Sequence, residues 1–331
     1  MTEVVTIGEC LVAFVASTPG PLAEASTFQR FVAGAEANVA VGLARLGHSV
    51  EFVGRVGDDG FGDAIRRQLR GEGVEIAALT VDPEAATGLM FRERRVVGAA
   101  NVVYARRDSA GSRLTAANVE AVFASGAHDG ARWLHLTGIT PALSADARSA
   151  TERAIECARA AGMTISLDLN LRRRLWPDTA AAPILRSLAG SVDVILGSPD
   201  EVAVVTHLTA GHDPAELARA SLELGASVAV IKLGAAGALA LDRDAMSEAV
   251  SRPALDLPVV IDPVGAGDAF CAGFIAGRLE GADLATALDM GNACGAAAAS
   301  AVGDQTGLPD RRELAGILLA ASDRLSPDTL R

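Results

Sequence analysis

This 331-residue sequence is poor in aromatic residues and in lysine. Only 4% of its residues are aromatic, and Lys232 is the single lysine, so arginine supplies the other basic side chains. The formal net charge is −12 at pH 7. Nucleic-acid binding normally requires a basic surface, and single strands also need aromatic side chains on which bases stack. The composition therefore argues against a nucleic-acid partner.

Motifs for structural metals, disulfides and membrane insertion are also missing. The four cysteines are scattered without a CxxC pair, and the five histidines form no HExxH motif. No apolar run approaches the roughly 20 residues that cross a bilayer. Met1 to Val5 leads directly into a strand-like run rather than a signal peptide. We therefore expect a cytoplasmic protein with no membrane partner and reduced cysteines.

What is present is an alternation of short apolar runs and helical patterns, which predicts an α/β fold with a mostly parallel sheet covered by helices on both faces. The runs that predict strands are Val4–Ile7, Val50–Val53, Trp133–Leu136, Thr164–Leu167, Val192–Leu196, Val228–Leu233 and Ala238–Leu241. The segments that predict helices are Ala37–Leu46, Asp63–Arg70, Ala145–Ala160, Glu216–Leu224 and Ala269–Leu279.

Two segments, about 11–32 and 88–106, interrupt this alternation. Their alternating apolar residues fit two interpretations: strands that pair with each other as a small sheet, which would be a lid that excludes water from the site, or ordinary edge strands. We place them inside one domain, 1–320, followed by a C-terminal tail, 321–331.

The most informative stretch is Asp262-Pro-Val-Gly-Ala-Gly-Asp268. It follows the apolar run Leu257–Ile261, read as a strand, and it opens a helix. Backbone N–H groups at a helix N-terminus bind anions, and glycines allow a phosphate to approach. A carboxylate beside phosphate suggests phosphoryl transfer to a hydroxyl, with Asp268 as the base. A tight turn with a capping Asp explains the same residues.

Two further glycine-rich segments are candidates for ligand contacts. Gly34 and Asn38 lie at the start of a predicted helix, where Asn38 could bind a polyol hydroxyl. Lys232, Gly234 and Gly237 follow a predicted strand and could meet a nucleotide. This is not a Walker A loop, because GxxxxGK[ST] is absent. Helix–sheet packing and a β-turn, respectively, are the simpler explanations.

Charged residues near other strand ends complete the candidates. Ser198 and Glu201 fit either a helix cap or a magnesium site through water. Tyr104 and Arg106, two residues apart on a predicted strand, would share a face and, with Arg172, form a cationic pocket for a carboxylate. A surface arginine on a strand is equally common.

Together these motifs resemble the ribokinase-like (PfkB-type) carbohydrate kinases. Asp262 to Asp268 resembles their C-terminal signature, and Gly34-Ala-Glu-Ala-Asn38 with the segment 54–62 resembles their N-terminal one. Within that family, Leu134–Ser144, Asp168–Arg172 and Tyr104-Ala-Arg106 resemble the 2-keto-3-deoxygluconate kinases.

The resemblance implies ATP-dependent, Mg²⁺-dependent phosphorylation of a small sugar acid by a ribokinase-like domain, with a lid often shared in a homodimer. It implies a base, Asp268, and an anion hole of Gly265, Ala266 and Gly267. The implied substrate contacts are Gly34, Asn38, Met90, Tyr104, Arg106, Arg172 and Asp304. The implied nucleotide contacts are Asn170, Arg172, Ser198, Lys232, Gly234, Gly237 and Asn292, with Glu201 as the metal residue.

Three departures from the family pattern bear on the substrate or on the metal site. Ala13 replaces an aspartate that binds sugar hydroxyls in many family members, Met90 stands where these kinases can place a tyrosine, and Ser198 replaces the asparagine of the Asn-x-x-Glu metal motif. The loss of the aspartate suits a substrate with its own negative charge. The alternatives are a fructokinase or another neutral-sugar or nucleoside kinase, a kinase for the galactonate-derived epimer, a dehydrogenase, and a non-catalytic sugar-binding protein.

Overall fold

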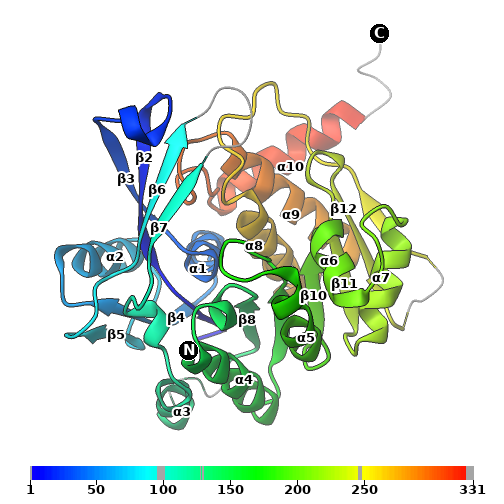
Figure 1. Ribbon diagram of the computed structural model, residues 1–331. Helices are drawn as coiled ribbons and strands as arrows, with labels where there is room; N and C mark the ends of the chain where they lie inside the picture. The colour runs from blue at the N-terminus through cyan, green and yellow to red at the C-terminus, as the bar shows by residue number, and fades with distance from the viewer. Residues whose placement is uncertain (1, 95–100, 127, 129, 245–247, 326–331) are drawn as a thin grey trace.

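A computed structural model describes residues 2–94, 101–126, 128, 130–244 and 248–325. Within these residues, nine strands form one large sheet in the order β13-β12-β11-β10-β9-β8-β1-β4-β5, and four form a separate small sheet in the order β3-β2-β6-β7. Neighbouring strands from β10 through β9, β8, β1 and β4 to β5 run parallel, and only β12 and β13 add antiparallel pairs. The predicted α/β fold with a mostly parallel sheet is confirmed (Figure 1).

Each of the seven predicted runs overlaps a strand of the large sheet, although Val192, Asp193 and Leu233 lie outside the observed strands. Their bounds are β1 Val4–Ile7, β4 Val50–Gly57, β5 Leu79–Asp82, β8 Trp133–Thr137, β9 Thr164–Asp168, β10 Val194–Gly197, β11 Val228–Lys232, β12 Ala238–Asp242 and β13 Val250–Arg252. The small sheet comprises β2 Leu11–Pro19, β3 Phe28–Ala33, β6 Leu89–Arg94 and β7 Val102–Ala105. Of the two interpretations of the segments that interrupt the alternation, the structure therefore supports the small sheet: the segments pair with each other and not with an edge of the large sheet.

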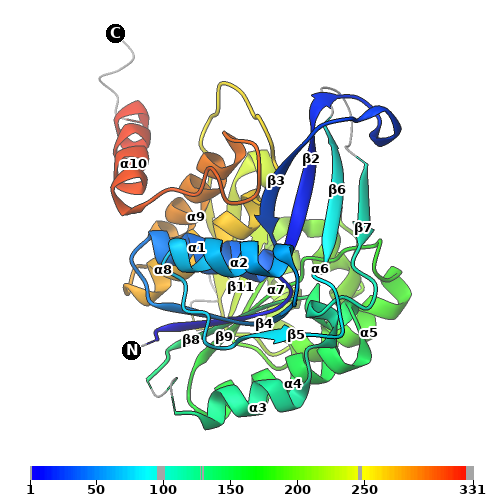
Figure 2. The same cartoon turned by 90° about the vertical axis from the view of Figure 1, so that its left-hand side faces the viewer.

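The helices pack on both faces of the large sheet, over two separate apolar cores. One face carries α1 Ala35–Arg45, α2 Gly60–Gly71, α8 Ala266–Leu279 and α9 Leu284–Ala299, and the other carries α3 Ala116–Ala124, α4 Ala145–Ala160, α5 Asp178–Ala189, α6 Pro199–Thr206 and α7 Pro214–Glu223 (Figure 2). The last helix, α10 Arg311–Leu325, extends into the segment expected to be a tail. Among the described residues, no helix is both long and apolar enough to cross a membrane.

One predicted strand is wrong. Residues 257–261 form a loop between β13 and α8, and Val259 is 67% exposed. The backbone N–H groups of Ile261 and Asp262 both donate to the carbonyl of Ala299 at the end of α9, not to a neighbouring strand. The apolar run therefore supplies a connection to α8, while β13 occupies the sheet edge.

Candidate active site

A cavity of about 620 Å³ lies between the carboxyl ends of the large-sheet strands and the small sheet. It is the place where an open α/β sheet binds ligands. The predicted site residues that line it are Gly34, Asn38, Met90, Tyr104, Arg106, Asn170, Arg172, Ser198, Glu201, Lys232, Gly265, Gly267, Asp268 and Asp304. Residues from both predicted signatures, more than 200 positions apart, thus share one cavity.

Four predicted residues do not line this cavity: Ala266, Gly234, Gly237 and Asn292. Asn292, on α9, donates its side-chain amide to the carbonyls of Arg252 and Pro253 at 3.3 and 3.0 Å, which anchors the chain after β13. Gly234 and Gly237, with φ values of 59° and 97°, form the turn between antiparallel β11 and β12. The simpler explanation, a turn, accounts for both glycines.

The N-terminus of α8 forms one wall of the cavity. Gly265 precedes the helix with φ 84°, and a Cβ there would stand 2.7 Å from the carbonyl oxygen of Asp304. At Gly267, Nζ of Lys232, 3.6 Å from a hypothetical Cβ, is the one atom of the described residues outside the helix backbone that lies within 4 Å. The first turn of α8 is therefore open to the cavity on a glycine surface, which fits the approach of an anionic group such as a phosphate.

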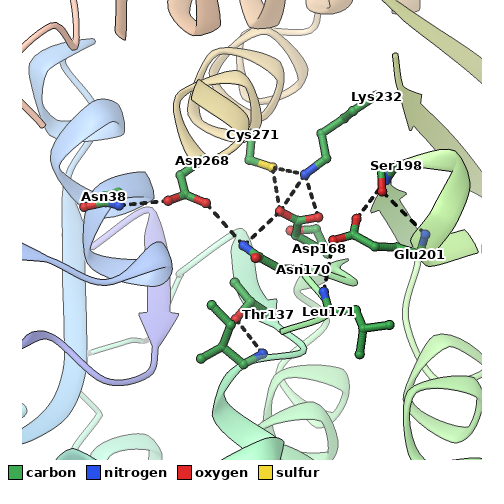
Figure 3. A network of polar contacts seen from close by, with 12 residues as sticks. Asn38, Thr137, Asp168, Asn170, Leu171, Ser198, Glu201, Lys232, Asp268 and Cys271 are labelled. Carbon is green, nitrogen blue, oxygen red and sulfur yellow. Dashed lines mark hydrogen bonds and ion pairs between the residues drawn. The ribbon is translucent and has the colours of Figure 1, made fainter. Parts of the chain in front are cut away.

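Asp268 lies in this first turn and is only 7% exposed. Its carboxylate accepts hydrogen bonds from two neutral amides, Nδ2 of Asn38 at 2.8 Å and Nδ2 of Asn170 at 3.3 Å (Figure 3). Burial raises the pKa of Asp268, and the Asn38 hydrogen bond and the Arg172 charge partly offset this rise. The group is thus a stronger base than an exposed aspartate and is held in one orientation.

A second carboxyl group, Asp304, stands beside the first. Burial and then the charge of Asp268 raise the pKa of Asp304 to about 6. Asn38 connects the two, since its Nδ2 also lies 3.5 Å from Asp304, and Gln305 donates to Oδ1 of Asn38 at 3.0 Å. Gln305 therefore fixes which end of the Asn38 amide faces the two carboxyl groups.

The predicted carboxylate contacts on the lid side are already partly engaged. Arg106 is ion-paired with Glu9, which also accepts from the hydroxyl of Ser109, and the Arg106 guanidinium stands 5.4 Å from the centre of the Tyr104 ring. Tyr104 and Arg106 do share a face, as the sequence predicted. Glu9 is 2% exposed and Arg106 is 8% exposed, so the carboxylate neutralises the guanidinium where little water reaches either group.

The three consecutive arginines have different environments. Arg173 is paired with Asp178, and Arg174 donates to the carbonyl of Val102 and the side chain of Asn101 on the small sheet. Arg172 lines the cavity, and its side chain forms no hydrogen bond or ion pair with any residue of the described ranges. It is therefore the guanidinium available to an anionic ligand.

Ser198 and Glu201 form a reciprocal capping box at the start of α6. Glu201 accepts from the backbone N–H groups of Ser198 at 2.8 Å and Leu171 at 3.0 Å, so both its oxygens are engaged (Figure 3). The part of the chain that the structure describes contains no cluster of three His, Cys, Asp or Glu residues that could hold a metal. These residues fit Mg²⁺ only as an ion carried mainly by phosphates and water, with Glu201 nearby.

Besides the Arg106–Glu9 pair, sequence reasoning missed two further ion pairs at the cavity. Arg92, on β6, binds Asp262 through two hydrogen bonds of 2.7 and 2.5 Å, and this links the small sheet to the start of the α8 motif. Asp168, at the end of β9, binds Lys232 at 2.7 Å. The position of Asp168 at a strand end, in a chain with one lysine, was the only signal available. Arg92 gave none, since its partner is 170 residues away.

The comparisons with known proteins agree with this geometry. The sequence profile of the pfkB family carbohydrate kinases matches residues 1–311. This chain belongs to that family. It is 39% identical over 324 residues to a 2-dehydro-3-deoxygluconokinase of Bacillus subtilis (96% of each chain) and 38% identical over 330 residues to that of Thermoproteus tenax (97% of this chain, 95% of the other).

A solved structure of a putative ribokinase II from E. coli, in complex with ATP and Mg²⁺, resembles this kinase with a TM-score of 0.86. The two are 27% identical, and the similarity covers 97% of this chain and 100% of the other. The ribokinase-like fold predicted from the sequence is thus confirmed, and the chain is a carbohydrate kinase.

Proposed function

We propose that this kinase transfers the γ-phosphoryl group of ATP to the 6-hydroxyl of 2-keto-3-deoxygluconate (2-dehydro-3-deoxy-D-gluconate). The observation that carries the proposal is the cavity that presents Asp268 together with the Arg172 guanidinium, which has no partner among the described residues. The names of the Bacillus subtilis and Thermoproteus tenax relatives support the same substrate.

The position of Ala13 supports an acidic substrate over a neutral sugar. Ala13 is fully buried in an apolar cluster with Leu11, Ala33 and Met90 on the small sheet. A carboxylate at position 13 would have to be desolvated among these side chains. Three members of the cluster, Leu11, Ala33 and Met90, line the cavity and offer a substrate no strong hydrogen bond, which suits a deoxygenated carbon better than a hydroxyl.

The residues divide the reaction between binding and proton transfer. Arg172, assisted by Tyr104 and Arg106, binds the substrate carboxylate, which leaves the far hydroxyl toward Asp268. Asp268 accepts the proton of that hydroxyl as the new P–O bond forms and the bond between the γ-phosphorus and the leaving ADP breaks, and its raised pKa favours this step. The backbone N–H groups at the start of α8 stabilise charge on the transferred group. Mg²⁺ bound with the nucleotide would neutralise phosphate oxygens.

The small sheet acts as a lid in this proposal. Arg92 and Arg174 connect it to the core on two sides of the cavity. Exclusion of water keeps the phosphoryl group from hydrolysis.

An acceptor panel tests the substrate. The purified protein with ATP and Mg²⁺ is assayed against 2-keto-3-deoxygluconate, its galactonate-derived epimer, fructose, ribose and adenosine. We expect the highest kcat/KM for 2-keto-3-deoxygluconate, with Asp268→Asn as the inactive control. A preference for fructose, ribose or adenosine would refute the acidic substrate, and a preference for the epimer would correct the stereochemistry only.

A further inference from the structure

The only lysine of this chain is held by a buried carboxylate that the proposed reaction does not use. Lys232 ends β11, and its Nζ lies 2.7 Å from both carboxylate oxygens of Asp168, which ends β9. The two strands lie on either side of β10. The side chain of Asp168 is 1% exposed, and that of Lys232, which lines the cavity, is 16% exposed. Figure 3 shows the contact between the two side chains. The pair therefore bridges two strand ends directly beneath the cavity.

The ammonium group borders the anion-binding end of α8. Nζ of Lys232 lies 3.6 Å from the position that a Cβ would take at Gly267, and both residues line the cavity. Burial alone would lower the pKa of Lys232, but the charge of Asp168 raises it above its ordinary value. Asp168 thus keeps a charged donor at the place where a phosphoryl group would meet the helix N-terminus.

Asp168 also connects to the base. Nδ2 of Asn170 lies 3.5 Å from Oδ2 of Asp168 and 3.3 Å from Oδ1 of Asp268. Asn170 adopts φ 35°, a left-handed conformation that non-glycine residues rarely occupy. The side-chain amide is therefore held between two carboxylates, and one of them, Asp168, is neutralised by Lys232.

We propose that Asp168 is a positioning residue, which holds the Lys232 ammonium against the first turn of α8 for the transferred phosphoryl group and directs the Asn170 amide toward Asp268. The proposal rests on the proposed kinase reaction. A purely structural ion pair would contribute to stability without making Lys232 respond to nucleotide.

A spectroscopic test exploits the single lysine. Protein labelled with 13C-lysine gives side-chain signals from Lys232 alone, so its pKa and its contact with nucleotide are read without activity. In the wild type we expect the Lys232 ammonium to stay protonated from pH 6 to 10. We also expect the chemical shifts of its side chain to change when the Mg²⁺ complex of a non-hydrolysable ATP analogue is added. In Asp168→Asn we expect the titration to enter this range and the nucleotide shift to decrease.

The outcomes separate the possible failures. Loss of the nucleotide response in the wild type, or an unchanged titration and response in Asp168→Asn, overturns the positioning role even if the kinase reaction stands. A chain that phosphorylates no sugar acid but shows both lysine effects refutes the substrate and keeps Asp168 in its role toward nucleotide. If Asp168→Asn does not fold, Asp168→Glu retains the charge but displaces the ammonium. In Asp168→Glu, Lys232 should keep its high pKa but show a smaller chemical-shift change with nucleotide. A nucleotide response as large as that of the wild type overturns the proposal.

Steady-state kinetics provide the second readout. A lost charge-assisted hydrogen bond corresponds to about 10- to 100-fold, so we expect Asp168→Asn to lower kcat by that factor with a much smaller change in KM for ATP. A KM change without a kcat change contradicts the role. The matched control is Glu156→Gln, which removes a carboxylate from the exposed pair with Arg153 on α4 and should leave kcat unchanged.

The acid limb of the kcat profile should move in opposite directions in two variants. Asp168 raises the pKa of Asp268 and Lys232 lowers it, so the limb should fall to lower pH in Asp168→Asn and rise in Lys232→Met. Shifts in the same direction contradict the role. The other charged or titratable groups that interact with Asp168, Lys232 or Asp268 in the described residues include Arg172, Glu36, Asp304, Glu201, Cys271 and His135, and both variants retain them.

Discussion

The two walls of the cavity hold their buried charges differently. On the lid side, Arg92 is paired with Asp262 and Arg106 with Glu9, so each cation has a counter-ion. On the core side, Lys232 is likewise paired with Asp168, but Asp268 accepts hydrogen bonds from the amides of Asn38 and Asn170 and forms no ion pair within the described residues. Ion pairs fix geometry at the expense of reactivity, whereas neutral amides orient a carboxylate and leave it able to accept a proton. The difference separates residues that hold the site together from the residue that acts in it.

The largest expected effect follows from removing the carboxylate on the core side. Asp268→Asn keeps the hydrogen-bonding shape but cannot accept a proton, so kcat should fall by about 10²–10⁴, the usual contribution of a general base. Binding of ATP, measured by calorimetry, should persist. Near-normal turnover in this variant would show that Asp268 is not the base.

The next effect breaks an ion pair on the lid side. Arg92→Met leaves Asp262 buried without its counter-ion, which typically costs about 3–5 kcal/mol of stability. Urea unfolding measures the loss. The matched control is Arg173→Met, whose pair with Asp178 is exposed and should contribute under about 1 kcal/mol. Equal losses in the two variants would contradict the role of Arg92 as an anchor of the lid.

Removal of the unpartnered arginine should affect one class of substrate. Arg172→Gln should raise KM for 2-keto-3-deoxygluconate by about 10- to 100-fold, the range for a hydrogen bond between charged groups. Fructose, which has no carboxylate, should be affected much less. Arg106→Ala should show the same preference, and an equal change for both substrates would rule out carboxylate recognition by either arginine.

The pH dependence tests the coupling between the two carboxyl groups. Burial and then the charge of Asp268 raise the pKa of Asp304 to about 6. In Asp268→Asn that charge is lost, so the pKa of Asp304, read from its carboxyl carbon signal by NMR, should fall below about 6. An unchanged or higher pKa of Asp304 would show that the two groups are not coupled.

The smallest expected effect concerns Met90 in the apolar cluster of the small sheet. Met90→Tyr adds a hydroxyl beside Tyr104, on the neighbouring strand β7. One added neutral hydrogen bond contributes about 0.5–1.5 kcal/mol, so KM for the keto-acid should fall by about two- to tenfold. Comparison of the two C4 epimers measures whether the change also alters stereochemical preference, and a raised KM would show that the pocket has no room for the ring.

Much of this arrangement could be predicted from local patterns. Val4–Ile7 and Ala145–Ala160 match β1 and α4 residue for residue, because a buried strand and an amphipathic helix carry their own periodicity. The run 257–261 misled, since three exposed apolar residues resemble a buried strand when burial is unknown. Gly237 and Asn292 are assigned to a nucleotide site by motif. In the structure, Gly237 lies in the turn between β11 and β12, and Asn292, on α9, donates to the carbonyl of Pro253 after β13.

The sequence by itself determined the reaction class, because the N-terminus of α8, its glycines and Asp268 are contiguous and carry their chemistry locally. Only the tertiary structure decided which charges are available. Arg106 and Lys232 look like free cations in the sequence, yet each has a buried carboxylate partner from a distant segment, while Arg172 has none among the described residues. The physical reason is that the pKa of a buried charged group and its freedom to bind a ligand depend on the groups around it. Those groups come from strands and loops that meet only in the fold.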